Sequence, residues 1–268
     1  MAIESVLLNV RDIARSVEFY ERLLDATVVK STDDSAELDL VTARFLLTRV
    51  DAPADSTWVG DDLQRGFRHV GFKVSDLDDR VAALHEAEVP FHLEPIHAEG
   101  GVRITFFYDP DGTLLELVEG PLQYHEVYDR EAVDQDWGLG EPDRPRFDHV
   151  AETVADIETT TAHFSSLGYV RMAGIHQPSD DRGFEITFLR SGDSSLEVFT
   201  YDKAEKQQRT PQLDALGFAA VTFGGTGTGT GTGAGGGGRG GATVAVGTLL
   251  GQDVLTDPDG LPYIVARA

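Results

Sequence analysis

The chain has 268 residues and carries 46 Asp and Glu against 22 Lys and Arg, a formal charge of −24. This charge excludes nucleic acid and anionic membranes as expected partners, because both are bound by neutralising negative charge with Lys and Arg. Cysteine is absent, so disulfides, thiolate metal sites and a cysteine nucleophile are excluded, and any metal ion must be held by His, Asp or Glu.

With 41% apolar residues the chain can build one large domain or two ordinary ones. It has no basic N-terminal segment before a long apolar run, and no stretch approaches the ~18 apolar residues of a membrane span, so we expect a cytoplasmic protein. Only four of the basic residues are Lys, and the acids are spread along the chain. This pattern is typical of a surface adapted to a high-salt cytoplasm.

One pattern occurs in three copies along the chain, and a fourth copy is incomplete. A short strand pattern ends at an Asp suited to cap a helix, an amphipathic helix pattern follows, and β-rich segments come after it. We therefore predict a repeated βαβββ unit. The strand-to-helix openings lie at 3–13, 66–77 and 146–157, the β-rich segments at 36–50, 102–119 and 184–201, and the fourth unit begins near 217–223.

The fourth unit lacks the helix. In its place stands the Gly- and Thr-rich tract 224–241, and glycine costs up to about 1 kcal/mol per residue in a helix, so we predict a flexible loop. The polar segment 123–142 predicts a linker. The expected domains are therefore 1–122, with units one and two, and 143–268, with units three and four.

A His and a Glu stand at matching positions in the two middle units. His69 precedes Glu116 by 47 residues, and His149 precedes Glu197 by 48. Each Glu interrupts an apolar strand pattern, and burying an unpaired carboxylate costs several kcal/mol, so a cationic partner is indicated. Taken alone, each Glu could face solvent across a half-exposed sheet. The matching histidines favour a metal ion.

The four units, with the helix opening at 12–20 and the turn and strand at 109–116, resemble the vicinal oxygen chelate superfamily, which includes glyoxalase I, extradiol dioxygenases and bleomycin resistance proteins. The resemblance implies an α+β fold of two glyoxalase-like domains, with the fourth unit degenerate. It also implies that two units share one cavity, in which His69, Glu116, His149 and Glu197 hold one divalent ion: Ni, Zn, Co, Mn or Fe.

The other two units have lost these ligands, with Ser5 and, approximately, Leu47 in unit one and Ala220 and Ile264 in unit four. The four remaining candidate ligands share one cavity only if unit one pairs with unit four and unit two pairs with unit three. The exchanged pairing resembles that of fused glyoxalase I chains, and it leaves a vestigial second cavity.

Four protein ligands favour proton transfer over dioxygen chemistry. We therefore expect a metal-dependent, glyoxalase-like lyase or isomerase that abstracts a proton from a small oxygenated substrate and stabilises the enediolate. By family likeness Glu116 is the first candidate for the base and Glu197 the second. Thr153 stands where glutathione-using members generally carry Arg, which indicates a different thiol adduct or a different substrate.

Two alternatives stay open. An Fe(II) extradiol-type dioxygenase would use His69, His149 and Glu116, although Phe106 occupies the place of the family's Tyr. A small-molecule-binding protein of the resistance type would need no metal. A nucleotide cofactor is not expected, because the tract 224–241 lacks the Lys of a phosphate-binding loop.

Overall fold

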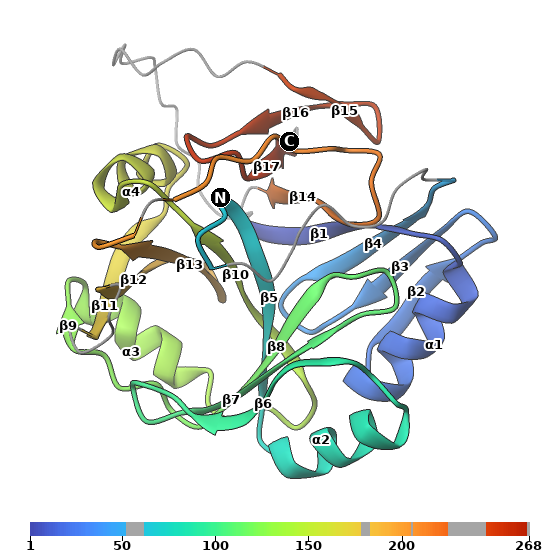
Figure 1. Ribbon diagram of the computed structural model, residues 1–268, viewed down its shortest axis with the longest axis horizontal. Coiled ribbons are helices and arrows are strands. Elements are labelled where there is room, and N and C mark those ends of the chain that lie inside the picture. The colour runs from blue at the N-terminus through green and yellow to red at the C-terminus, as the bar shows by residue number, and fades with distance from the viewer. Residues whose placement is uncertain (52–61, 178–182, 205, 225–244, 267–268) are drawn as a thin grey trace.

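The computed structural model describes residues 1–51, 62–177, 183–204, 206–224 and 245–266. Within them the chain forms two mixed sheets with few helices, an α+β fold (Figure 1). The predicted loop 224–241 lies, apart from Gly224, outside the described residues.

The first two units follow the predicted βαβββ order. Unit one contains β1 (Ala2–Val10), α1 (Ile13–Leu24), β2 (Thr27–Ser31), β3 (Ser35–Asp39) and β4 (Arg44–Arg49). Unit two contains β5 (Gly66–Val74), α2 (Leu77–Glu86), β6 (Phe91–His97), β7 (Arg103–Tyr108) and β8 (Leu114–Glu119).

In the second half of the chain, unit three repeats this order. Unit three contains β10 (Arg146–Thr153), α4 (Ile157–Ser165), β11 (Val170–Gln177), β12 (Phe184–Ser191) and β13 (Ser194–Tyr201). The described part of unit four contains β14 (Gly217–Gly224), β15 (Gly247–Leu249), β16 (Gln252–Thr256) and β17 (Pro262–Val265). The segment expected as a linker holds β9 (Glu126–Val127) and α3 (Arg130–Gly138).

Two of the three predicted Asp caps form. The Asp12 and Asp156 carboxylates accept hydrogen bonds from the third backbone N–H of α1 and α4, at 2.9 and 2.8 Å. Asp76 makes no such bond at α2, because its carboxylate pairs with Arg80 instead, at 3.0 Å. Among the described helices, none has the length and apolar character that crossing a membrane requires.

The two sheets pair the units as the ligand losses predicted. An eight-stranded sheet, β15-β16-β17-β14-β1-β4-β3-β2, joins units one and four through the antiparallel pair β1 and β14. A nine-stranded sheet, β6-β7-β8-β5-β10-β13-β12-β11-β9, joins units two and three through β5 and β10. Strands from both ends of the chain therefore lie side by side in one sheet (Figure 1).

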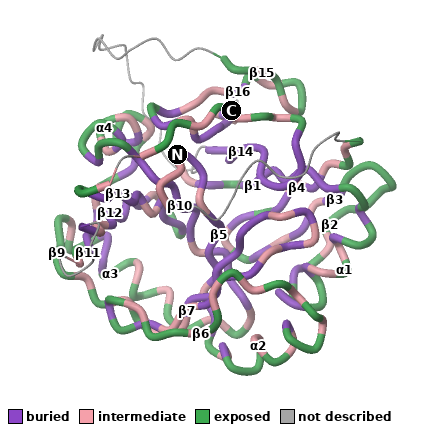
Figure 2. The backbone as a smooth tube through the Cα atoms, in the orientation of Figure 1, coloured by how far each residue is buried: buried purple, intermediate pink, exposed green. Residues whose placement is uncertain are grey.

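The main core contains buried residues from both sheets, and the central strands are buried along most of their length (Figure 2). The Phe45 ring on β4 lies 5.7 Å from the Phe72 ring on β5. In the second sheet, Val70 and Phe72 and their neighbours Leu115 and Leu117 belong to this core. Because side chains alternate along a strand, the residues between them point to the opposite face of the sheet.

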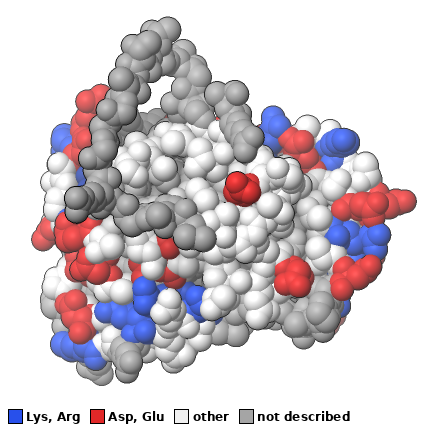
Figure 3. Space-filling view, turned by 90° about the horizontal axis from the view of Figure 1, so that it is seen from above, with Lys and Arg blue, Asp and Glu red and all other residues white. Residues whose placement is uncertain are grey.

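Charged side chains of both signs mark the surface. On the face shown in Figure 3, acidic and basic groups gather toward the two ends, and few charges lie in the middle outside the grey atoms. The net charge of −24 is thus not concentrated in one patch of this face.

Candidate metal centre

Strand alternation brings the four predicted residues to one place on the second sheet. His69 lies on β5, Glu116 on β8, His149 on β10 and Glu197 on β13. The registers of the two units match, since Glu116 pairs with the residue two after His69, and Glu197 with the residue two after His149. The antiparallel pairing of β5 with β10 then sets the two histidines beside each other.

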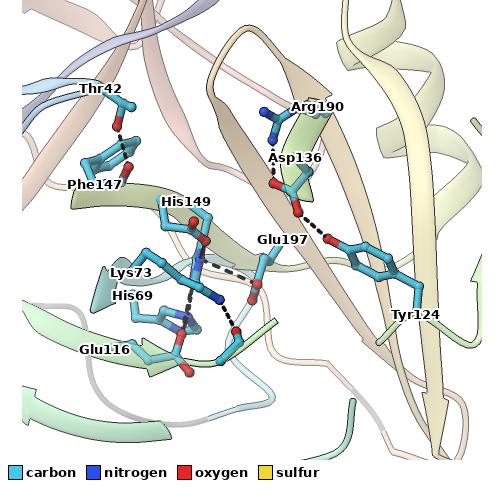
Figure 4. A network of polar contacts seen from close by, with 12 residues as sticks. Thr42, His69, Lys73, Glu116, Tyr124, Asp136, Phe147, His149, Arg190 and Glu197 are labelled. Atoms are coloured by element: carbon cyan, nitrogen blue, oxygen red, sulfur yellow. Dashed lines mark hydrogen bonds and ion pairs between the residues drawn. The ribbon is translucent and has the colours of Figure 1, made fainter. Parts of the chain in front are cut away.

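Three donor atoms form a nearly equilateral triangle (Figure 4). The Nε2 atoms of His69 and His149 lie 3.0 Å apart, and Glu116 Oε2 lies 3.1 Å from the first and 3.0 Å from the second. Glu197 lies beside the triangle, with Oε1 3.5 Å from His149 Nδ1. One ligand atom from each of the four residues lies within 4.8 Å of all the others.

These donors fit a divalent ion. Metal–nitrogen and metal–oxygen bonds of about 2.1 Å place adjacent ligands of an octahedron about 3.0 Å apart, which matches the edges of the triangle. Two imidazoles with carboxylates are ligands that Ni, Zn, Co, Mn and Fe(II) accept. In the described part of the chain, no other group of three or more His, Asp or Glu side chains brings its ligand atoms so close together.

The two histidines are fully buried and differ in their surroundings. Burial lowers the pKa of His69 to about 4, and its Nδ1 has no hydrogen-bond partner among the described residues. Burial also disfavours the charged form of His149, but Glu197, Asp148 and Glu116 surround it and raise its pKa. His69 is therefore a neutral imidazole that can bind a cation directly.

The two glutamates also differ. Burial favours the neutral acid at Glu116, but the adjacent His69 and His149 outweigh this effect and lower its pKa to about 2. Burial raises the pKa of Glu197 to about 8, and the charges of Glu116 and Asp148 add to the rise. Without a cation, the centre thus holds one firmly ionised carboxylate and one carboxyl that keeps its proton near neutral pH.

Sequence reasoning missed two residues that position His149. Its Nδ1 lies 3.0 Å from Asp148 Oδ2, although neighbours on a strand normally point to opposite faces. A register shift between Phe147 and His149 accounts for this, because a bulge turns the extra residue toward the same side. Gly71 lies against the ring, and a Cβ there would be 2.0 Å from His149 Cε1.

A cavity of about 320 Å³ opens beside the centre, and Glu116 and Glu197 both line it. Glu197 also lines a smaller cavity of about 150 Å³. Helix α3 contributes to the smaller one through Asp136, which pairs with Arg190 at 2.6 Å and accepts a hydrogen bond from Tyr124 at 2.9 Å (Figure 4). The sequence had indicated only a linker there.

The first sheet has no ligands at the equivalent positions. Leu7, two residues after Ser5, pairs with Leu46, so Leu46 and not Leu47 occupies the place of the Glu. Leu47 was off by one residue, and it points into the core, where it is 1% exposed. The positions in unit four are as expected, since Thr222, two residues after Ala220, pairs with Ile264.

Comparison with known proteins agrees with this fold. Residues 2–117 match the family model of the Glyoxalase/Bleomycin resistance protein/Dioxygenase superfamily. The uncharacterized protein YwkD of Bacillus subtilis is 31% identical over 125 residues, which are 44% of this chain and 96% of YwkD. The fosfomycin resistance protein FosX of Listeria monocytogenes is 26% identical over 133 residues, 45% of this chain and 95% of FosX.

Among solved structures, glyoxalase I from Zea mays superposes with a TM-score of 0.65 at 18% identity, covering 98% of this chain and 91% of that one. This likeness extends to the whole two-sheet fold. The chain belongs to the glyoxalase, bleomycin resistance protein and dioxygenase superfamily, and its two sheets form two glyoxalase-like domains.

Proposed function

We propose that this chain is a divalent-metal-dependent lyase or isomerase of the glyoxalase type, acting on a small oxygenated substrate. The observation that carries the proposal is the set of four buried or nearly buried donors, His69, His149, Glu116 and Glu197, gathered within 4.8 Å beside a cavity. A divalent ion held by these donors would supply Lewis-acid polarisation of a carbonyl oxygen.

The protein residues would hold the ion and orient its ligands. His69, His149 and Glu116 hold the ion, because their donor atoms already lie at the spacing of adjacent ligands. Asp148 fixes the orientation of the His149 ring through Nδ1, and partners of this kind strengthen metal binding in proteins.

Glu197 is the better placed of the two candidate bases. Glu116 faces both imidazoles, so its carboxylate is already engaged. Glu197 lies outside the triangle, and its carboxylate lines both cavities with its side chain 12% exposed. We infer, against the order that family likeness suggested, that Glu197 takes the proton from the carbon next to the substrate carbonyl and returns it to the carbonyl carbon, while the hydroxyl proton passes to the former carbonyl oxygen.

A direct test uses metal-loaded protein and the adducts of methylglyoxal with a panel of thiols, under argon. We expect metal-dependent isomerisation to 2-hydroxy thioesters for at least one adduct. Glu197→Gln should retain most of the metal, because His69, His149 and Glu116 hold the ion, and lose activity by about 10²-fold or more, as removal of a general base does. Retained metal with unchanged activity would remove Glu197 from this role.

The triangle alone also favours a second candidate. Two His and one carboxylate on one face of an octahedron is the arrangement typical of Fe(II) oxygenases. Phe106, which stands in the place of the extradiol Tyr, lies with its ring centre 4.9 Å from that of His69, and it offers no proton to a substrate. Oxygen consumption by the iron-loaded protein with catechols would favour this candidate over the isomerase.

A further inference from the structure

We propose that the substrate of this centre has an apolar, uncharged body about the size of a substituted aromatic ring, and that this body lies in the 320 Å³ cavity beside His69. The inference rests on the metal-dependent function proposed above. It adds the chemical class of the part of the substrate that does not react.

The walls of the cavity are mainly aliphatic and aromatic. The described apolar residues that line it come from β6, β7, β8, β11, β12, β13 and the adjoining segments: Leu93, Ile96, Ala98, Val102, Ile104, Phe106, Val118, Leu122, Ile175, Phe184, Ile186, Phe188 and Phe199. A cavity of about 150 Å³ holds benzene, so this one has room for a ring with substituents.

The apolar walls extend to the metal ligands themselves. The ring of His69 meets Phe106 edge to face, with centres 4.9 Å apart, and Phe199 in the same way at 6.0 Å. A substrate whose oxygens face the four donors therefore places its next atoms against aromatic carbon. Buried apolar surface of this kind stabilises an apolar body and penalises a polar one.

The charges of the cavity disfavour an anionic body. Arg68 is the one Lys or Arg among the described lining residues. Its guanidinium stacks on Phe199 at 4.3 Å, donates to the Tyr201 hydroxyl at 2.8 Å and pairs with Asp62 at 2.8 Å. Glu99 adds a further negative charge at the same cavity.

A phosphonate or a peptide with two carboxylates requires several cationic donors, and the described residues that line this cavity include only Arg68. The smaller cavity lined by Glu197 does not supply them either. There Lys73 donates to the Gly120 carbonyl, and Arg146 donates to the carbonyls of Leu139 and Gly140 at 3.2 Å. Asp136 and Asp148 line the same cavity and balance these two cations.

The test uses three hydroxamates, which share one oxygen-bearing, metal-binding end and differ in the body. Acetohydroxamate carries a methyl group, benzohydroxamate a phenyl ring and 4-carboxybenzohydroxamate a charged ring. Titration calorimetry on the metal-loaded protein gives their dissociation constants. We expect benzohydroxamate to bind at least about tenfold more tightly than acetohydroxamate, because a buried ring gains the free energy of a buried aromatic side chain. The added carboxylate should cancel this gain.

The outcomes separate the inference from the function on which it rests. Equal affinity for the methyl and phenyl compounds, or tighter binding of the charged one, would contradict the inference that the substrate has an apolar body. The proposed metal centre would be unaffected by either result. If none of the three binds while the metal is present, the proposed function itself fails, and the inference fails with it.

A pair of variants locates the body in this cavity. Ile186→Ser adds a hydroxyl to the wall on β12 and should weaken benzohydroxamate several-fold while leaving acetohydroxamate unchanged. Leu46→Ser makes a comparable change in the other sheet, away from the four candidate metal ligands, and should affect neither compound. Equal effects of the two variants on benzohydroxamate would place the body elsewhere.

Discussion

The Nε2 atoms of His69 and His149 lie 3.0 Å apart, although the two residues are separated by 80 positions and belong to different repeat units. The antiparallel pairing of β5 with β10 produces this contact. At this distance the two facing nitrogens need a proton or a cation between them, because their lone pairs would otherwise repel each other.

Removing either histidine should therefore remove the same ion. His69→Ala and His149→Ala are each expected to reduce bound metal from about one ion per chain to near zero, measured by elemental analysis after gel filtration. Ser5→Ala changes the equivalent position in the other sheet and should leave the metal content unchanged. Two variants that each keep half of the metal would contradict a shared centre.

Gly71 supports the centre by leaving room for the His149 ring. In Gly71→Ala the new Cβ would lie about 2.0 Å from that ring, so the imidazole must move and metal affinity should fall by 10-fold or more, comparable to the loss of a positioning partner. Gly138→Ala is the matched control, because nothing lies within 4 Å of its added Cβ. Equal metal affinities, measured with a competing chelator, would show that the ring position is not limiting.

Two buried acids outside the site, Asp257 and Glu152, are expected to make stability depend on pH. The equivalent turn with Asp109 serves as the comparison. Asp109 accepts hydrogen bonds from two backbone N–H groups and from the Tyr20 hydroxyl, at 2.6 Å. Asp257 stands at the equivalent turn and also accepts two backbone N–H bonds. The fully buried carboxyl of Glu152 lies beside Asp257, and burial together with the nearby charges of Asp257 and Asp259 raises the Glu152 pKa.

Burial raises the pKa of Glu152, and burial also raises that of Asp257 to about 6. Because both folded pKa values exceed the unfolded ones, the stabilisation is fully present below about pH 4 and is lost as the pH rises through about 6 and above. Glu152→Gln keeps a donor at every pH and should raise the free energy of unfolding at pH 8 by on the order of 1–2 kcal/mol, with little gain at pH 4.

The contrasting variant lies at the equivalent turn, where Tyr20→Phe changes the partner of Asp109. It removes the donor to the buried Asp109 and should lower stability by about 1–3 kcal/mol. Urea unfolding at several pH values distinguishes the two. A Glu152→Gln variant that is less stable than the parent at pH 8 would contradict the cost of ionising Glu152 beside Asp257.

The net charge of −24 predicts a salt dependence of stability. Raising KCl from about 0.1 M to about 1 M shortens the screening length from about 10 Å to about 3 Å and weakens repulsion among the acids. The midpoint of urea unfolding should therefore rise over this range. A midpoint independent of salt would count against a surface adapted to high salt.

The repeats made the fold and the four candidate residues predictable, because strand alternation and ligand spacing are properties of local sequence. The loss of ligands at Ser5 and Ala220 even selected the pairing of the units, which the sheets confirm. Helix α3 was not predicted, since its nine residues bury only Ala132 and Val133 and so leave a weak apolar pattern.

Finer details of the site depend on tertiary geometry. The assignment of Leu47 in place of Leu46 was wrong by one residue, and in a strand a shift of one residue turns the side chain to the other face. Asp148 reaches His149 through a bulge, and bulges leave no reliable mark in the sequence. The preference for Glu197 over Glu116 as base likewise came only from the positions of their carboxylates.

The measurement that tests the central claim most directly is the metal content of the protein, purified in high salt without an affinity tag or chelator and reconstituted with divalent ions. The four donors around His69 and His149 predict about one Ni, Zn, Co, Mn or Fe per chain, lost in both histidine variants. Protein that binds no divalent ion after reconstitution would contradict the metal centre and leave a small-molecule-binding protein.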